Sequence, residues 1–323
     1  MSAFVHKTTE KTALTNENAE NLALEVFKAG GLVALPTETV YGLAADATNG
    51  EAVANIYEAK GRPSFNPLIV HCDSLEMAMQ YGEFSDEALK CAQHFWPGPL
   101  TLVVPYKKSA GLSDLVRAGL DTVAIRVPMG KARQIIGAYG KPIAAPSANL
   151  SGKISPTSAD HVAAALNGRI DLILDGGPAS VGLESTIVSF VEGKTALLRP
   201  GGLSTETLEE HIGAPLHHST PDGEIKAPGM MLSHYAPNAT LRLSVTEVDG
   251  EDGALTFGAA KLDADHVLSL SENGDLKEAA ANLFSCLTRF DELGVKRIAV
   301  SPIPTSGLGL AINDRLARAA APR

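Results

Sequence analysis

Short apolar blocks separated by glycine- and proline-containing turns predict helices and strands that follow one another along the first two hundred residues. In NAENLALEVFKAGGLVAL, residues 18–35, apolar residues give one helical face, a glycine pair ends the helix, and LVAL is a short buried strand. EAVANIYEAKG, residues 51–61, repeats the helical pattern and closes on a glycine. In SDEALKCAQHFWPGP, residues 85–99, Ser85 is expected to cap a third helix.

Further apolar blocks are short enough to be buried strands. We expect strands in PLIVH (67–71), PLTLVVPY (99–106), TVAIRVP (122–128), PIAAPSAN (142–149), DLILDGG (171–177), STIVSF (185–190) and TALLRPGG (195–202). One more helix, SADHVAAALNG, lies among them with Ser158 as its cap. Because helices are too few to connect every strand pair, the pattern predicts an α/β domain with a twisted mixed sheet.

The pattern changes after residue 205. Residues 206–238 are rich in proline, glycine and histidine and show little apolar periodicity, as is typical of a linker. A second α/β unit, residues 239–323, follows, with strands in ALTFG, HVLSL and RIAVSPI and long helices at 276–294 and 307–321. We therefore expect a first domain at 1–205 with a polar tail to about residue 18, a linker, and a smaller Rossmann-like domain.

Composition limits the class of protein. Forty-five percent of the 323 residues are hydrophobic, enough for two cores, and the net charge of −10 argues against stable nucleic-acid binding through a broad basic face. Three cysteines without a paired spacing favour a reducing compartment. No segment has the length of a signal peptide or a membrane span, so we expect a cytoplasmic protein without membrane contact.

Several predicted strands end in polar motifs: PTETVYG after LVAL, SANLSG after IAAP, and RPGG after ALL. Ligands of open α/β sheets gather at strand ends, so these motifs are candidates for one cleft. Turn chemistry alone also places proline, glycine, serine and asparagine at such junctions. For a single motif the two explanations have even weight, and the series as a whole favours the cleft.

KGRPSFNPLIVH, residues 60–71, is the first candidate anion site. Lys60 and Arg62 lie two residues apart in a turn, where a point charge and a bidentate fork can reach one polyphosphate. Each charge-assisted hydrogen bond contributes roughly 1.5–3 kcal/mol. The alternative is a solvated helix C-terminus, where cations meet the helix dipole. Taken alone, this motif leaves the solvated turn slightly ahead.

Two further features suggest anion binding. Ser147, Asn149 and Ser151 of PSANLSG, together with backbone amides, can form a nest for phosphate or carboxylate, or simply a side-chain-stabilised turn. Arg126 interrupts the apolar strand VAIRVP, so it must meet an anion or a carboxylate, and a structural ion pair is equally compatible. The sequence contains no P-loop, no dinucleotide fingerprint, no HExxH and no GxSxG.

Taken in order, PTETVYGL, KGRPSFNPLIVH, WPGPLTLV, VAIRVP, PSANLSG, STIV and RPG closely resemble the threonylcarbamoyl-AMP synthase family over residues 20–205. APGMMLSHYAP resembles the linker of the long form of these enzymes, and NLFSCLTRFDELGVKRIAVSPIPTSGLGLAINDRL its extra C-terminal domain. The resemblance implies that L-threonine and bicarbonate give N-carboxythreonine, which attacks the α-phosphate of ATP and expels pyrophosphate. The adenylate then serves N6-threonylcarbamoyladenosine formation in tRNA through downstream transfer proteins.

The resemblance also implies the site residues. Lys60, Arg62, Ser147 and Asn149 correspond to catalytic positions. Threonine is expected to contact Thr37, Thr39, Tyr41, His71, Arg126, Ser147 and Ser185. ATP is expected to contact Lys60, Arg62, Asn66, Thr122, Asn149, Ser151, Thr157, Arg199, His234 and Tyr235, the last two closing as a lid from the linker. Mg²⁺ accompanies ATP and is carried mainly by its oxygens, with no protein ligand.

One departure and three rivals remain. Met231, Leu232 and Ser233 stand where the resemblance implies basic or aromatic residues, which puts any extra phosphate contact there in doubt. An RNA-binding module is disfavoured by the charge, and a carbamoyl-phosphate enzyme by the missing extra domains. A regulatory paralogue that binds nucleotide without turnover is disfavoured by the intact KGR and SAN motifs.

Overall fold

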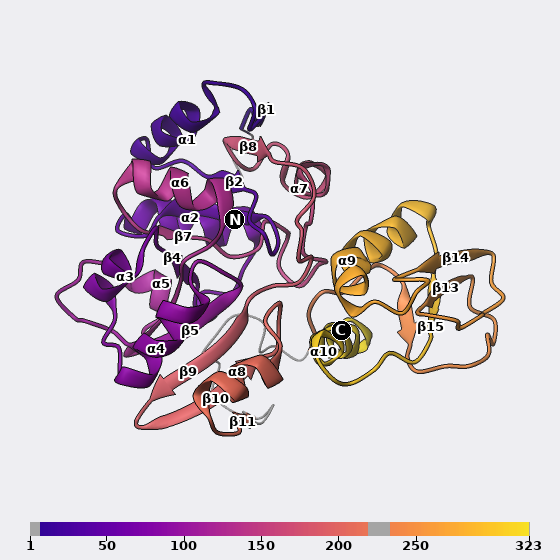
Figure 1. Cartoon of the computed structure of the whole chain (residues 1–323). Coiled ribbons are helices and arrows are strands. Elements are labelled where there is room, and N and C mark those ends of the chain that lie inside the picture. Colours follow the sequence, from indigo (N-terminus) through magenta and orange to yellow (C-terminus); the bar gives the residue numbers. More distant parts are fainter. Residues whose placement is uncertain (1–6, 219–232, 323) are drawn as a thin grey trace.

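The larger unit is built on one mixed sheet in the computed structural model, which describes residues 7–218 and 233–322 (Figure 1). The strand order in the described chain is β1 (Glu10–Ala13), β8 (Leu172–Asp175), β2 (Val33–Leu35), β3 (Gly42–Asp46), β7 (Ile143–Ala144), β4 (Ile69–His71), β6 (Thr122–Arg126), β5 (Leu100–Pro105), β9 (Thr186–Val191), β10 (Lys194–Arg199) and β11 (His217–His218). Parallel and antiparallel pairs occur together, which confirms the predicted mixed sheet.

Helices cover both faces of this sheet because the strand side chains alternate between two cores. The helices are α1 (Ala19–Lys28), α2 (Gly50–Lys60), α3 (Leu75–Tyr81), α4 (Asp86–Phe95), α5 (Asp114–Arg117), α6 (Gly130–Tyr139), α7 (Ala159–Leu166) and α8 (Thr205–Ile212). In β2, Val33 and Leu35 pack with α1 and α6, whereas Ala34 faces the core formed with α2, α4 and α7. The sheet is therefore buried on both sides.

The predicted helix boundaries follow from local chemistry. The side chains of Ser85 and Ser158 accept hydrogen bonds from the backbone N–H groups of Ala88 and His161, each at 3.2 Å, which confirms both caps. Gly61 ends α2 with φ of 59°, a left-handed conformation that glycine adopts without a Cβ penalty. The chain therefore reverses directly after Lys60, so that the side chains of Lys60 and Arg62 leave the turn in different directions.

Two segments differ from the sequence expectation. Part of the polar tail expected up to residue 18 forms β1, which pairs in parallel with β8. Part of the linker expected at 206–238 is helical: Ser204 caps α8 and Leu208 is buried in the core of the first unit, while β11 pairs with β10. The apolar pair Leu208 and Ile212, four residues apart, packs against the core of the first unit. The polar composition of the segment gave no prediction of this helix. Met231 and Leu232 lie outside the described residues.

The smaller unit contains a parallel sheet in the order β12 (Thr240–Arg242), β15 (Arg297–Val300), β13 (Gly253–Thr256) and β14 (His266–Ser269). Helices α9 (Leu276–Leu293) and α10 (Leu308–Ala320) pack together beside it, toward the larger unit (Figure 1). The result confirms the expected second α/β unit. Within residues 7–218 and 233–322, every helix is too short or too polar to cross a lipid bilayer.

Candidate active site

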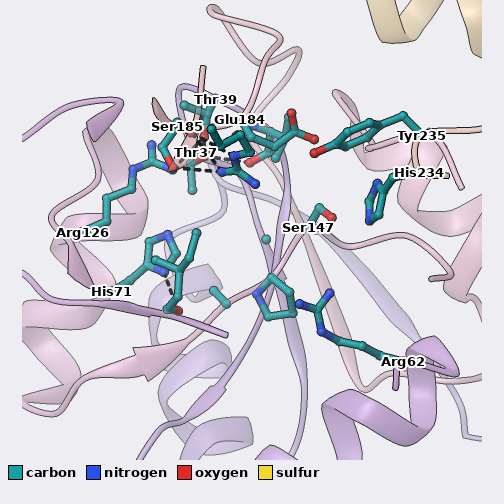
Figure 2. A pocket seen from close by; sticks show the side chains of 16 residues that line it. Thr37, Thr39, Arg62, His71, Arg126, Ser147, Glu184, Ser185, His234 and Tyr235 are labelled. Carbon is teal, nitrogen blue, oxygen red and sulfur yellow. Dashed lines mark hydrogen bonds between the residues drawn. The ribbon is translucent and has the colours of Figure 1, made fainter. Parts of the chain in front are cut away.

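Motifs that are far apart in the chain, between Thr37 and Tyr235, meet in one pocket (Figure 2). Its lining includes ten of the predicted site residues: Thr37, Thr39, Arg62, His71, Arg126, Ser147, Ser185, Arg199, His234 and Tyr235. In Figure 2, His71 and Arg126 lie on one side and His234 and Tyr235 on the other, with Ser147 between them. The expectation that separate strand-end motifs converge on one cleft is therefore met by the geometry.

Arg126 is buried at the end of β6, and each of its three side-chain nitrogens donates one hydrogen bond to the protein. Its Nη2 donates to Glu38 Oε1 at 2.6 Å, its Nη1 to the Thr39 hydroxyl at 2.8 Å, and its Nε to the Gly98 carbonyl at 3.1 Å. The ion pair with Glu38 is itself buried. Glu38 thus forms an ion pair with an arginine that also lines the pocket. The sequence did not predict Glu38 as the partner of Arg126.

His71 lies opposite Arg126 in the β4–β6 register and is 4% exposed. Burial, and then the charge of Arg126, lower the pKa of His71 to about 3. Its Nδ1 lies 3.2 Å from the Ile69 carbonyl oxygen, which the N–H tautomer at that nitrogen would satisfy. The imidazole is therefore neutral at physiological pH and can hydrogen-bond to a ligand but not attract it as a cation.

This neutral histidine makes folding sensitive to acid. Unfolded His71 binds a proton below about pH 6.5, whereas the folded form resists protonation until about pH 3, so stability is lost as pH falls through that window. The loss is about 1.4 kcal/mol per pH unit at most. We expect His71→Asn to show a shallower fall of Tm than the unchanged protein between pH 7 and 4.5. Parallel curves in calorimetry would contradict the assignment.

The PTETVYG loop supplies the hydroxyls beside Arg126. The Thr37 and Thr39 hydroxyls are 2.8 Å apart, and the Thr37 hydroxyl donates to the Val40 carbonyl at 2.6 Å. Tyr41 lies behind the pocket, where its hydroxyl donates to the Gly177 carbonyl at 2.7 Å. Burial chiefly raises the pKa of Tyr41 to about 12. Tyr41 therefore supports the loop, and the two threonines face the pocket.

Lys60 is 2% exposed, so the solvated-turn alternative for KGR is wrong. Its Nζ donates to the carbonyl of Ser147 at 2.6 Å and to the carbonyl of Asn149. Burial, and then the positive charge of Arg62, hold its pKa well below the usual range. An anion bound nearby would offset that cost, because opposite charge favours the ionised amine.

Arg62 lines the pocket from the opposite side of the same turn. Its Nη2 donates to the Pro67 carbonyl at 2.8 Å and its Nε to the Asn66 carbonyl at 3.2 Å. Arg199, at the end of β10, donates from Nη2 to the Ser185 carbonyl at 2.9 Å. Arg62, Arg126 and Arg199 thus bring three guanidinium groups to one small cavity.

The PSANLSG loop lies between these cations. Gly42 and Ser147 form an isolated bridge, and the Ala148 N–H donates to the Tyr41 carbonyl at 2.8 Å, which docks this loop on PTETVYG. The Ser147 hydroxyl donates to Asn149 Oδ1, as in a side-chain-stabilised turn. The turn and the site are therefore the same structure: Ser147 faces the pocket while Asn149 is buried behind it.

His234 and Tyr235 reach the pocket from the linker. Tyr235 has a φ of 63°, uncommon for a tyrosine, and its ring lies 4.1 Å from that of His234. Nδ1 of His234 and the hydroxyl of Tyr235 are buried and have no hydrogen-bond partner among the described residues. Buried polar atoms are rarely left so. These two side chains are therefore available to hydrogen-bond to a ligand in the pocket.

Four of the predicted residues stand behind the lining: Tyr41, Lys60, Asn66 and Asn149. Three do not reach this pocket in the structure. Thr122 begins β6 opposite Pro105, the Ser151 N–H donates to the Lys60 carbonyl, and the Thr157 hydroxyl lies 3.4 Å from His161 Nδ1. The pocket also contains Glu184, which sequence reasoning missed, although it directly precedes the predicted strand STIVSF.

Carboxylates are too few here to hold a metal ion by themselves. Both Glu184 oxygens are engaged, Oε1 by the Ser155 hydroxyl and Oε2 by Arg315 Nε. In the described part of the chain, no three histidine, cysteine, aspartate or glutamate side chains gather at metal-binding distance. The pocket is arranged for anionic ligands held by arginines, hydroxyls and backbone groups.

Comparisons with known proteins agree with this geometry. Residues 25–201 match the family model described as "Telomere recombination", and residues 203–321 match that of the "Threonylcarbamoyl-AMP synthase, C-terminal domain". The threonylcarbamoyl-AMP synthase of Pyrococcus abyssi is 43% identical over 92% of this chain and 93% of its own length. That of Bacillus subtilis is 44% identical over 99% and 97%.

A solved structure is also similar over nearly the whole chain. The crystal structure of Pyrococcus abyssi Sua5 complexed with L-threonine has a TM-score of 0.88 and 39% sequence identity, and the match covers 97% of each chain. The match therefore includes both α/β units of this chain. By these nearly full-length matches, the chain belongs to the threonylcarbamoyl-AMP synthase family.

Proposed function

We propose that the pocket joins L-threonine, bicarbonate and ATP into L-threonylcarbamoyladenylate and releases pyrophosphate. The family makes the chain a nucleotidyltransferase that forms this adenylate and uses ATP and L-threonine. The observation that carries the proposal is the meeting of Arg62, Arg126 and Arg199 around Ser147. An anionic nucleotide and an amino-acid carboxylate both need such countercharge in a site shielded from water.

Threonine is assigned to the side of the pocket that contains Arg126 and His71. Arg126 pairs with its carboxylate, and neutral His71 contributes a hydrogen bond. The hydroxyl groups of Thr37, Thr39 and Ser185 complete the polar surface, with Tyr41 supporting the loop from behind. The buried pair of Arg126 with Glu38 supports this assignment, because a carboxylate is the natural partner of this guanidinium and a substrate carboxylate would compete with Glu38 for it.

ATP is assigned to the side that contains Arg62 and Arg199, with His234 and Tyr235 closing over it. Lys60, Asn66 and Asn149 act from behind: Lys60 holds the PSANLSG carbonyls and adds positive potential near the phosphates. The unpartnered His234 Nδ1 and Tyr235 hydroxyl support a ligand on this side. Thr122, Ser151 and Thr157 belong to a more distant part of the nucleotide surface.

The chemistry requires positioning more than a protein nucleophile. A carboxylate oxygen of N-carboxythreonine forms a bond to the α-phosphorus while the bond from that phosphorus to the bridging oxygen breaks, and pyrophosphate leaves. Ser147 lies between the two substrate sides, where a hydroxyl or backbone N–H can steady the reacting groups. The arginines neutralise charge on the phosphates, and the buried site limits hydrolysis.

Mg²⁺ enters as part of the nucleotide substrate in this proposal. The engaged oxygens of Glu184 make ATP oxygens and water its natural ligands. The product is a mixed anhydride that must be passed to proteins that transfer the threonylcarbamoyl group to tRNA. The free thiols of Cys72, Cys91 and Cys286 support a cytoplasmic reaction.

The test is a pyrophosphate-release assay with the purified chain. We expect release from ATP only when L-threonine and bicarbonate are both present, and an adenylate product detectable by mass spectrometry. Bicarbonate must be removed by degassing to make that omission meaningful. Equal release with either substrate omitted would contradict the proposal and favour a nucleotide hydrolase. Nucleotide binding with no release under any condition would favour a regulatory paralogue.

A further inference from the structure

The C-terminal unit reaches the pocket through one buried arginine. Arg315, on α10, is fully buried, and its Nε donates to Glu184 Oε2 at 2.8 Å. Glu184 lines the pocket, and the two partners are 131 positions apart in the chain. The other Glu184 oxygen accepts from the Ser155 hydroxyl. A side chain of the second unit therefore determines where a charged group of the pocket stands.

The same guanidinium contacts two other segments around the pocket. Its Nη2 donates to the carbonyl of Pro200 at 2.9 Å, and its Cζ lies 5.1 Å from the centre of the Tyr235 ring. Its Nη1 donates to Asp314 at 2.6 Å, so a carboxylate of its own helix shares the charge. Arg315 thus joins the RPGG turn, the linker and Glu184.

The backbone around Glu184 is also held between the units. Gly182 has a φ of 74°, and a Cβ there would lie 2.4 Å from Ala281 Cα in α9. Leu183 packs in the core of the second unit. On the other side, a Cβ on Gly201 would lie 2.3 Å from the Glu184 carbonyl oxygen. Such close approaches leave little freedom, so the second unit sets the position of both backbone and side chain.

Charge balance gives the pair a specific consequence. Burial acts to raise the pKa of Glu184, but the charges of Arg315 and Arg199, together with the hydrogen bonds from Ser155 and Arg315, lower it on balance. Without Arg315 the carboxylate would be buried next to a pocket with one fewer countercharge. It would then move or take up a proton.

We propose that Arg315 is a positioning residue that acts through Glu184, so that the C-terminal unit forms part of the active site. The inference rests on the proposed function. Glu184 is followed directly by Ser185, which lines the pocket and whose hydroxyl lies 2.7 Å from that of Thr101. Ser185 belongs to the side of the pocket that the proposed function assigns to threonine. A shift of Glu184 therefore displaces the surface that receives the amino acid.

The main test is steady-state kinetics of Arg315→Met. We expect KM for L-threonine to rise about tenfold or more, with a smaller change for ATP. A purely structural role would lower the folded fraction and hence the apparent kcat, but it would leave KM unchanged. A KM for L-threonine within twofold of the unchanged enzyme would overturn the proposal, as would a loss confined to kcat. Arg315→Lys, which keeps the charge, is expected to recover part of the affinity.

A double-mutant cycle tests the route through Glu184. In Glu184→Gln, Arg315 keeps Asp314 as a partner, so this variant is expected to fold. If Arg315 acts through Glu184, adding Arg315→Met to Glu184→Gln changes KM for L-threonine less than twofold. Full multiplication of the two single effects would overturn the proposal. If Arg315→Met alone fails to fold, the double variant, which lacks the charges of both Arg315 and Glu184, can still be compared with Glu184→Gln.

Arg289→Met is the matched control. Arg289 forms a surface pair with Glu292 on α9 of the same unit, more than half exposed on both sides, and should leave KM and kcat unchanged. Circular dichroism and thermal unfolding verify the fold of each variant. If the protein without substitutions releases no pyrophosphate, the proposed function is contradicted. If that protein is active and Arg315→Met leaves its KM for L-threonine unchanged, only this inference is contradicted.

Discussion

Lys60→Ala is expected to lower kcat by about 100- to 1000-fold, the effect typical of removing one preorganised charge-stabilising donor. Lys60 is almost wholly buried and its amine holds the carbonyls of Ser147 and Asn149. Its loss removes positive potential beside the proposed position of the α-phosphate and leaves two carbonyls without that donor. The Ser147 loop then loses its alignment with the arginines.

The same change should also destabilise the fold by about 1–3 kcal/mol, the usual cost of unsatisfied buried acceptors. Urea unfolding measures this separately from single-turnover pyrophosphate release. Lys60→Met, which retains most of the volume, is expected to match the alanine variant in kcat. Lys28→Ala is the matched control, since Lys28 also ends a helix but is exposed. A kcat within threefold of the unchanged enzyme in both Lys60 variants would remove this residue from the mechanism.

Arg126→Met is expected to raise KM for L-threonine by about 100-fold or more. A bidentate guanidinium–carboxylate contact contains two charge-assisted hydrogen bonds, each worth about 1.5–3 kcal/mol. The substitution also leaves Glu38 buried without its countercharge, so stability falls by about 3–5 kcal/mol. Isothermal titration with L-threonine measures the binding loss directly, and calorimetric unfolding measures the stability.

Glu38→Gln separates the two roles of Arg126. Glu38 competes with an incoming carboxylate for the same guanidinium, so neutralising it should lower KM for L-threonine. The double variant Glu38→Gln with Arg126→Met should recover stability but not affinity, because no buried charge remains unpaired. Equal increases of KM in Glu38→Gln and Arg126→Met would instead indicate that the ion pair matters and that Arg126 does not bind the substrate.

Burial opposes the charge of two cations of the site, Lys60 and Arg62, in the unliganded pocket. The pKa of Lys60 and the pKa of Arg62 are lowered mainly by burial, that of Arg62 to about 10. Anion binding relieves this cost, so part of the gross interaction energy compensates desolvation. The pocket is therefore expected to discriminate strongly against neutral ligands.

Local sequence chemistry accounts for most of the secondary structure. Ser85 and Ser158 cap their helices because the hydroxyl oxygen of each accepts a hydrogen bond from the backbone N–H three residues later, which has no partner within the helix. The strands between them follow from short apolar runs, which needed no knowledge of their partners. The helix at 205–212 was missed because it contains only two large apolar residues, Leu208 and Ile212, and is followed by a segment rich in proline and histidine.

The candidate site was predictable where one motif carries its own chemistry. Arg62, Arg126 and Ser147 stand out as an arginine in a turn, an arginine within an apolar strand and a hydroxyl in a nest-like loop, and all three line the pocket. Their assignment to particular substrates came from the family resemblance. The partnership of Lys60 with the Ser147 loop was not visible, because spacing alone placed Lys60 and Arg62 on a shared anion.

The sequence by itself determined the family, the α/β class and the motifs that meet at strand ends, since these depend on residue identity and near neighbours. Only the tertiary structure decided that Gly61 sends Lys60 behind the pocket and Arg62 into it, that Glu38 occupies Arg126, and that Arg315 holds Glu184. The last two pairs join residues 88 and 131 positions apart. Charges so distant in the chain become partners only when packing excludes water from both.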